Sequence, residues 1–580
     1  MNRILLFCLL LIYLFSCSEK KSFFEHQGGT IRMCLEHEPI NYKTSEIADY
    51  YSTTVFSQVM EGLVGIDPKT LKVKNQIASS WKINDDGTSY SFTIRDDIYF
   101  HPNKIFSNSK DRILKHEDII ASFEMMCTPS SKGKASVAYN HLLKDLIVGA
   151  EDYFEKKSKT ITGITSENGK LIIKLLHRDD NFLFKLSQIQ LSIHSKKIIE
   201  ANLLKEMVGT GPFIYNAIDK YDDMPAFLLG KNEEYYETDE QGNALPYLDS
   251  IHFYIQNSQI AQLDLFEKKE IDFILSLPTS KITKMVEGRL SDFNSSPPKL
   301  ILTKNALLQT HYYFFNMNEE RFKDPKVRQA FNYAINREKI GRDILKNQFD
   351  ELGFYGITPP INKIFKGYNF DEIKKFGYEY NPEKAKKLLK EAGYPNGEGF
   401  GSVNLRYHIG DVNSAVANEF AQQIYQVLGI NINMDGSDYD QFTTDAINGN
   451  GDLFKSSWIA DYPNPENFLS SFFSQNIPNL DHSSLGLNYS KYQNPIFDEL
   501  VNNAYQENNV TKKFNLFSKA EIELMKNPPL IPLWYTGDLQ IIHSYVRNFE
   551  FNSMSMFNFK NVYLKEWTAE EYQKEVTKKN

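Results

Sequence analysis

Hydrophobic residues in this chain follow two different periods, and the alternation between them constrains the fold more than any other feature. Tyr90, Phe92 and Ile94 alternate with polar residues directly after the turn-forming stretch N-D-D-G at 84–87, which predicts a hairpin strand. Between residues 325 and 335, apolar side chains instead recur on one face of a helix. Strands and helices are therefore mixed along the chain, and we expect an α/β fold.

Two of the predicted helices carry clear start signals. Asp324 and Asn381 have side chains that cap helix starts, and each is followed by a proline, which fits the first helical position. The helix that starts after Asn381 is expected to stop at Gly393, because glycine readily takes the left-handed conformation that ends helices.

Size and charge limit the class of protein. At 580 residues the chain is expected to contain two or three domains, and with 13% aromatic residues it should be folded throughout its body. The net charge is −9 and the acidic residues are dispersed, whereas nucleic-acid binding needs clustered lysine and arginine. We therefore expect no nucleic acid as a partner.

The N-terminus resembles a bacterial lipoprotein signal. Arg3 precedes an apolar run of twelve residues from Ile4 to Phe15, which is too short for a bilayer-spanning helix of roughly 20 residues. The run ends in L-F-S-C, which resembles a lipobox, so we expect a signal peptide at 1–16 and lipid on Cys17. Residues 17–27 would form a polar tether. The protein is then expected in the periplasm or cell envelope, anchored to a membrane through Cys17.

Two cysteines, Cys34 and Cys127, remain in the body of the chain. One disulfide between them is compatible with an exported protein, but their spacing does not require it. Two separate buried thiols are the alternative, and a chain of this length does not need a disulfide to be stable.

Catalytic and metal-binding motifs are absent from the sequence. The twelve histidines occur singly, and His116-Glu117 lacks the second histidine that a zinc protease helix would carry. There is no G-x-S-x-G motif, and Pro212 and Phe213 follow G-T-G where a phosphate-binding loop would need free backbone amides. We expect no enzyme activity, no metal and no cofactor.

The segment S-S-W-I-A-D-Y-P-N-P at 456–465 is the strongest candidate for a binding site. Asp461 lies between Trp458 and Tyr462, and the prolines that follow favour a rigid loop rather than a helix. Large aromatic side chains that exclude water would strengthen the attraction between this carboxylate and a cation. The residues alone leave a second interpretation open, in which Asp461 only caps a turn.

Several segments in order resemble the family 5 extracellular solute-binding proteins, the oligopeptide and dipeptide receptors of ABC importers. The most recognisable is F-K-D-P-K-V-R-Q-A-F-N-Y-A-I-N-R-E-K-I at 322–340. The others are V-M-E-G-L-V (59–64), I-A-S-S-W-K (77–82), D-G-T-S-Y-S-F-T-I-R (86–95), F-H (100–101), G-T-G-P-F (209–213), N-P-E-K-A-K-K-L-L-K-E-A-G-Y (381–394), W-I-A-D-Y-P (458–463) and P-L-I-P-L-W (529–534). The resemblance runs from about residue 28 to about 560.

This resemblance implies a type II periplasmic-binding-protein fold, in which two lobes joined by a hinge close on a ligand and an additional N-terminal subdomain is present. The implied divisions are lobe I at 28–57, 200–303 and 526–580, the additional subdomain at 58–199, and lobe II at 304–525. The helix at 325–335 is then mainly structural, so its recognisable sequence marks the family without marking the site.

The resemblance also assigns roles to the W-x-x-D segment. Asp461 matches the carboxylate that pairs with a peptide's α-ammonium group, and Trp458 would line a side-chain pocket, with Tyr462 beside it. Lys455 falls where such a receptor carries an arginine for the ligand carboxylate, but lysine offers a point charge without the bidentate fork. A surface lysine with no binding role is the alternative for Lys455.

These observations predict a monomeric, lipid-anchored receptor that captures peptides between its lobes and passes them to the permease subunits of an ABC transporter. Two alternatives stay open. The same fold also binds non-peptide solutes such as metal complexes, haem or sugars, and a receptor for cell-wall peptides would use the same cleft without any permease.

Overall fold

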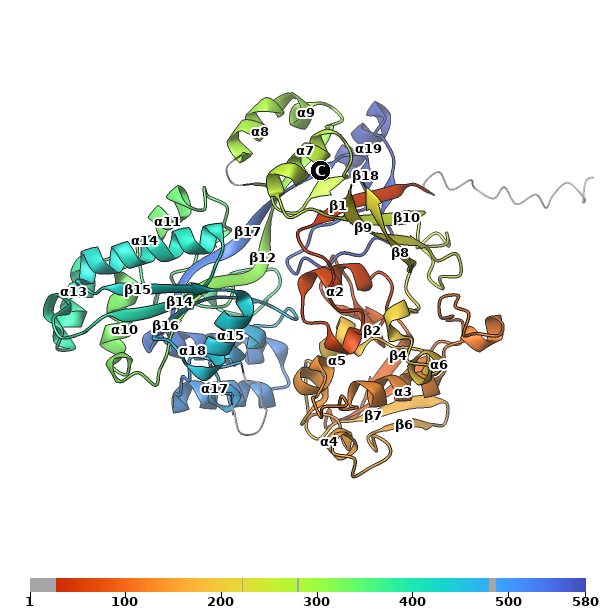
Figure 1. Ribbon diagram of the computed structural model, residues 1–580, viewed down its shortest axis with the longest axis horizontal. Helices are drawn as coiled ribbons and strands as arrows, with labels where there is room; N and C mark the ends of the chain where they lie inside the picture. Colours follow the sequence, from red (N-terminus) through yellow and green to blue (C-terminus); the bar gives the residue numbers. More distant parts are fainter. Residues whose placement is uncertain (1–27, 222, 279–280, 479–486, 580) are drawn as a thin grey trace, which may run out of the picture.

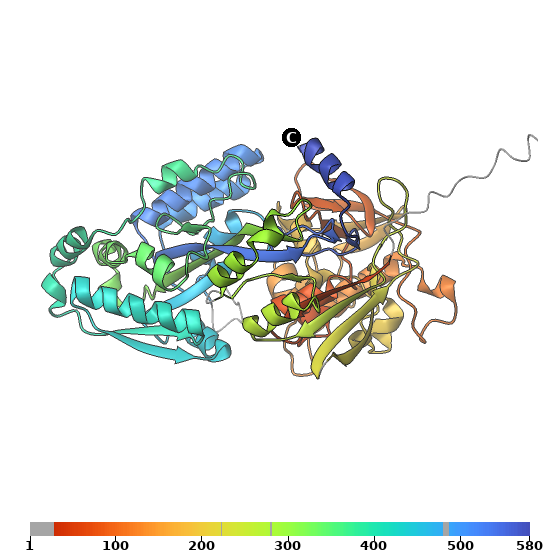
Figure 2. The same ribbon diagram turned by 90° about the horizontal axis from the view of Figure 1, so that it is seen from above.

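The computed structural model describes residues 28–221, 223–278, 281–478 and 487–579 (Figure 1). The predictions for the signal peptide, Cys17 and the tether lie outside this range. Among the described residues, no helix combines the length and the apolar character needed to cross a bilayer. The chain forms two bodies that lie side by side, joined along one edge by long strands (Figures 1 and 2).

One body, which we call lobe II because it holds most of residues 304–525, is built on a mixed sheet of seven strands in the order β11-β17-β12-β16-β14-β15, with β13 pairing to β17. Two of these strands, β11 and β17, come from outside residues 304–525. β12 is antiparallel to both of its neighbours, whereas β14 is parallel to β15 and β16. The strands are β11 (Phe273–Ile274), β12 (Leu300–Phe315), β13 (Glu351–Leu352), β14 (Val403–His408), β15 (Ile432–Ser437), β16 (Leu453–Ile459) and β17 (Leu530–His543).

Helices cover both faces of this sheet, so that lobe II has two hydrophobic cores. The core that contains Phe331, Phe420 and Leu533 lies on one face, and the core that contains Phe454, Phe517 and Tyr535 lies on the other. The helices are α10 (Pro325–Tyr333), α11 (Arg337–Asp343), α12 (Phe370–Lys374), α13 (Pro382–Glu391), α14 (Asp411–Leu428), α15 (Tyr439–Asn448), α16 (Glu466–Leu469), α17 (Pro495–Gln506) and α18 (Val510–Lys526).

The predicted helix starts are confirmed. The Asp324 carboxylate accepts a hydrogen bond from the Lys326 amide, 2.8 Å away, and Pro325 occupies the first position of α10. Asn381 caps α13 in the same way. Gly393, with φ of +95°, follows α13 in the left-handed conformation that favours glycine.

Residues from about 63 to 208 form a part with its own sheet and core, which we call the additional subdomain. Its sheet runs in the order β4-β5-β7-β6, and its core extends from Leu63 to Val208. The predicted hairpin is confirmed, because β4 and β5 are antiparallel neighbours and Tyr90 and Phe92 are buried. The elements are β2 (Val64–Ile66), β3 (Val73–Asn75), β4 (Ala78–Ile83), β5 (Ser89–Ile94), α3 (His116–Met126), α4 (Ala150–Phe154), β6 (Ile164–Glu167), β7 (Lys170–Lys174), α5 (Phe182–Leu186) and α6 (Lys196–Glu200).

The rest of the second body, which we call lobe I, combines segments from both ends of the chain. Its four-stranded sheet has the order β1-β10-β9-β8, and one core joins Ile31, Phe253 and Phe559. Its elements are β1 (Thr30–Leu35), α2 (Tyr50–Phe56), β8 (Phe213–Tyr221), β9 (Met224–Lys231), β10 (Ser250–Ile255), α7 (Gln259–Glu267), α8 (Ile282–Gly288), α9 (Leu290–Asn294), β18 (Val546–Arg547), β19 (Tyr563–Leu564) and α19 (Ala569–Lys579).

β12 and β17 run through both bodies, as Figure 1 shows. At one end of this strand pair, Leu300 and Ile541 belong to a lobe I core. At the other end, Phe314 and Leu530 belong to a lobe II core. The pairing shifts register between Ala306 and Thr310, part-way along the strands. This irregularity lies where the bodies join, which is where a hinge between them would have to bend.

Cys34 and Cys127 are both buried, free thiols. They belong to different cores, Cys34 to one of lobe I and Cys127 to that of the subdomain. Burial raises the pKa of each thiol to about 12. Of the two possibilities that the sequence left open, the structure therefore has two separate buried thiols and no disulfide.

Candidate functional site

Asp461 lies in a loop immediately after β16, as the two prolines predicted. β16 ends at Ile459, and the chain then turns through Pro463 before α16 begins at Glu466. Pro465 is the N-cap residue of this short helix. The Asp461 carboxylate is thus carried on a stiff connection between a central strand and a helix whose side chains are buried.

A single buried amide, that of Asn467, holds Asp461 and Trp458 together. Its Oδ1 atom accepts hydrogen bonds from the indole Nε1 of Trp458, at 2.9 Å, and from the backbone amide of Asp461, at 3.0 Å. Its Nδ2 group lies 3.4 Å from the Asp461 Oδ2 atom. Asn467 is only 3% exposed, so its orientation is fixed by the surrounding protein. The sequence analysis did not identify Asn467, although it follows the W-x-x-D motif by six residues.

The Asp461 side chain is accessible to solvent yet set deep among protein atoms. This surrounding protein raises the pKa of the carboxyl group, and the Asn467 amide partly offsets the increase. Within the described part of the chain, no lysine, arginine or histidine forms an ion pair with it. An accessible carboxylate that lacks a cation in a partly dry site is suited to bind one from solution.

Trp458 and Lys455 lie on opposite faces of β16. Side chains alternate along a strand, so Phe454 and Trp458 share one face, where both pack in the same lobe II core. Lys455 is on the other face and pairs across the ladder with Tyr313, which belongs to the second core. The structure thus brings Trp458 next to Asp461 and places Lys455 apart from them.

Lys455 is not a surface lysine, because it is only 5% exposed. Its Nζ atom donates to Asn413 Oδ1 at 2.7 Å, lies 3.3 Å from His311 Nδ1 and is 5.5 Å from the ring centre of Trp534. The His311 and Trp534 rings are stacked, with centres 4.3 Å apart. Burial lowers the pKa of the Lys455 ammonium to about 7. These three neighbours were not identified from the sequence.

Tyr462 is buried, and its side chain contacts Glu466 and the additional subdomain. Its hydroxyl donates to Glu466 Oε2 at 2.6 Å, and its ring is stacked on that of Phe184, with centres 6.0 Å apart. Phe184 belongs to the additional subdomain, so Tyr462 contributes to a contact between the two bodies in this structure. A role for Tyr462 in binding ligand stays a prediction.

The described residues contain no group of three or more histidine, cysteine, aspartate or glutamate side chains arranged to hold a metal ion. A family model for the bacterial extracellular solute-binding proteins, family 5 (middle), matches residues 72–479. The chain belongs to this family. Its members are non-catalytic solute-binding proteins, which agrees with the prediction that the chain is not an enzyme.

Relatives of known name resemble nearly the whole chain. Heme-binding protein A of Haemophilus influenzae is 27% identical over 87% of this chain and 87% of its own length. The dipeptide-binding protein of Escherichia coli is 22% identical over 92% of this chain and 95% of its own. Among solved structures, the periplasmic binding protein DppA of Helicobacter pylori in complex with the peptide STSA has a TM-score of 0.74 at 22% identity, covering 93% and 99% of the two chains. The predicted α/β periplasmic-binding-protein fold is confirmed.

Proposed function

We propose that this family 5 protein is a lipid-anchored receptor that captures peptides by their free amino terminus and delivers them to an ABC transporter permease. The observation that carries the proposal is Asp461, an accessible carboxylate that forms no ion pair with any described residue and is held in place by Asn467. The division into lobes at 303/304 and 525/526, with a cleft that closes on the ligand, is part of this proposal.

An ammonium group satisfies the chemistry of Asp461. A charge-assisted hydrogen bond to a desolvated ammonium is directional and roughly twice as strong as a neutral one. Such a bond recognises the amino terminus of a peptide, whatever the sequence of the peptide. The named dipeptide-binding relative and the peptide complex of a similarly folded protein support this choice of ligand.

Haem is the second candidate, because one relative is named a heme-binding protein. Haem carries two carboxylates and no amine, so it would engage Lys455 and the stacked His311 and Trp534 rings rather than Asp461. Titration of the purified protein with haem, followed by its absorbance spectrum, separates the candidates. A saturable spectral change that Asp461→Asn leaves intact would favour haem.

The decisive test of the peptide proposal combines Asp461→Asn with an N-acetylated peptide. The substitution keeps the shape and removes the charge, and breaking one side of such a pair costs roughly 2 to 5 kcal/mol, or about thirty-fold or more in affinity. An acetylated peptide lacks the ammonium, so it should bind the wild-type protein weakly and lose little more on mutation. Calorimetry on the four combinations gives a double-mutant cycle.

Asp371→Asn serves as the control, since Asp371 lies on the surface in the first turn of α12. If free and acetylated peptides lose equal affinity at Asp461→Asn, Asp461 is not the amine anchor and its role in the loop is structural. The lipid anchor is tested separately by metabolic labelling with a fatty acid, which Cys17→Ser should abolish.

A further inference from the structure

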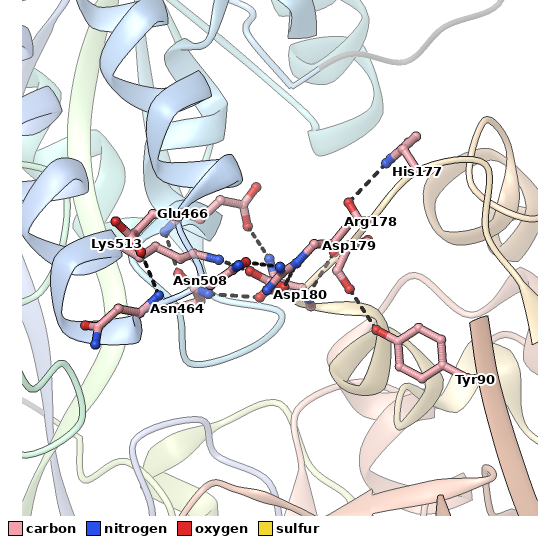
Figure 3. A network of polar contacts seen from close by, with 12 residues as sticks. Tyr90, His177, Arg178, Asp179, Asp180, Asn464, Glu466, Asn508 and Lys513 are labelled. Carbon is pink, nitrogen blue, oxygen red and sulfur yellow. Dashed lines mark hydrogen bonds and ion pairs between the residues drawn. The ribbon is translucent and has the colours of Figure 1, made fainter. Parts of the chain in front are cut away.

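A short segment of the additional subdomain, residues 178–184, contacts lobe II, as Figure 3 shows in part. Arg178, Asp180, Asn181 and Phe184 on the subdomain meet Tyr462, Asn464, Glu466, Asn508 and Lys513 on lobe II. We call this set of residues the clasp.

Asn181 makes the central contact of the clasp, and it uses both atoms of its amide. Its Nδ2 group donates to Glu466 Oε2 at 3.0 Å, while its Oδ1 atom accepts from Asn464 Nδ2 at 2.9 Å. Asn181 and Glu466 are each 8% exposed, so these bonds form where water is largely excluded. Buried polar groups that lose such partners are costly, which gives the contact energetic weight.

Charged residues flank this centre. Lys513 forms an ion pair with Asp180, and Arg178 donates to the Asn508 side chain, as the dashed lines in Figure 3 show. A cavity of about 870 Å³ borders the clasp, and its walls include Thr70 on one side and Lys363 on the other. At this cavity the subdomain and lobe II are separated, and the clasp is a contact between them at its border.

Hydrogen bonds tie the subdomain side of the clasp to the rest of the subdomain. The Asp179 carboxylate accepts hydrogen bonds from the backbone N–H of Asn181 at 2.8 Å and from Lys185 Nζ at 2.6 Å. Its backbone carbonyl accepts from the Tyr90 hydroxyl at 3.3 Å, which ties the segment to the subdomain's sheet. Asn181 is thus presented in a fixed orientation rather than on a free loop.

The lobe II side of the clasp is one residue away from the candidate amine site. Glu466 and Asn467 are adjacent in the first turn of α16. Glu466 accepts from the hydroxyls of Tyr462, at 2.6 Å, and Tyr505, at 2.9 Å, as well as from Asn181. Asn467 positions Trp458 and Asp461. One helical turn therefore has to be correctly placed for both the clasp and the amine site.

We propose that the clasp locks the two bodies together and is coupled to ligand binding through this first turn of α16. Occupation of Asp461 by an ammonium group and formation of the Asn181–Glu466 contact then stabilise each other. Because such coupling is reciprocal, weakening either one weakens the other. The coupling to an ammonium rests on the function proposed above, whereas the lock itself does not.

The test uses Asn181→Ala, which removes both amide contacts, with Leu176→Ala as the matched control. Leu176 lies two residues before Arg178 and its side chain is 58% exposed, so its loss should change nothing. For Asn181→Ala we expect a peptide with a free amino terminus to dissociate about tenfold faster, with little change in its association rate. Stopped-flow fluorescence measures both rates. In the Asp461→Asn background the effect of Asn181→Ala should shrink to about twofold.

The ligand-free protein tests the lock independently of the ligand. Asn181→Ala combined with Lys513→Ala should increase the radius of gyration measured by small-angle scattering, and circular dichroism should show an unchanged fold. An unchanged radius together with unchanged dissociation rates overturns the clasp. An increased radius with an undiminished effect of Asn181→Ala in the Asp461→Asn background overturns the coupling alone. If no peptide binds the wild-type protein, the proposed function fails, while the radius still decides on the lock.

Discussion

At the scale of the residue, Lys455 is the group whose behaviour should depend most clearly on pH. Burial holds its pKa at about 7, whereas the unfolded chain has a lysine pKa of about 10.4. Below pH 7 the folded protein therefore bears the full cost of a buried charge, and this cost falls as the pH rises from 7 towards 10. We expect Lys455→Met to stabilise the protein at pH 6 to 7 and to lose this advantage gradually above pH 7.

Urea unfolding of both proteins between pH 6 and 10 measures this difference. Between pH 7 and 10, the free energy of unfolding of the wild type should rise relative to that of the variant, by up to about 1.4 kcal/mol per pH unit. Lys339→Met is a control, because that lysine is a partly exposed partner of Glu419. Parallel pH profiles for wild type and Lys455→Met would show that the lysine remains charged in the fold.

The sequence could predict that Asp461 lies in a loop close to Trp458, because both belong to one short motif that is followed by prolines. Their roles in binding stay predictions. It could not predict the surroundings of Lys455, since Asn413 and His311 are 42 and 144 residues away along the chain. The sequence could have predicted that Lys455 and Trp458 face opposite sides of a strand, because residues three apart on a strand do so. What was missing was knowledge that this segment is a strand.

At the scale of the element, helices α10 and α11, which lie in the segment that resembles the family most clearly, each carry a buried arginine. Arg328 on α10 donates to backbone carbonyls, among them that of Pro528 at 2.8 Å. Arg337 on α11 donates to the Pro532 carbonyl at 2.6 Å and the Tyr378 carbonyl at 3.0 Å. The bonds to Pro528 and Pro532 fasten both helices to β17 and the residues before it, far from the Asp461 loop in sequence.

Arg337→Met should therefore lower stability without changing the site. Arg337 is 5% exposed, and its loss removes a hydrogen-bond donor from several carbonyls, so we expect a loss of roughly 3 to 5 kcal/mol. Arg342→Met, on the same helix but with an exposed side chain, should cost less than about 1 kcal/mol. Chemical denaturation measures both. A variant that is stable but loses peptide affinity would contradict the structural role.

Elements fixed by local sequence were predictable, and those fixed by distant contacts were not. The starts of α10 and α13 are predicted by their capping residues, Asp324 and Asn381, and by the prolines that follow them. The sixteen residues of β12, by contrast, pair with β16 on one side and with β17 on the other, and these partners come from far later in the chain. Their passage through both bodies depends on those pairings, so no local pattern reveals it.

At the scale of the whole molecule, the two bodies joined by β12 and β17 make ligand-driven closure the expected motion. A ligand shifts such an equilibrium only by the difference between its affinities for the closed and open forms. A peptide that contacts Asp461 and also favours the clasp has this difference. For an N-acetylated peptide, the difference between the affinities for the closed and open forms should be smaller, because this peptide has no ammonium group for Asp461.

Small-angle scattering should therefore show a smaller radius of gyration when the protein is saturated with a free peptide. At the same concentration the acetylated peptide should leave the radius nearer to the ligand-free value, because it lacks the ammonium that Asp461 would hold. Asn181→Ala combined with Lys513→Ala gives the sharper comparison, since its ligand-free form should be open even where the wild type is already partly closed. If saturating peptide leaves the radius of this variant unchanged, the bodies do not close on the ligand. Peptide affinity would then have to come from lobe II alone, where Asp461 and Trp458 both lie.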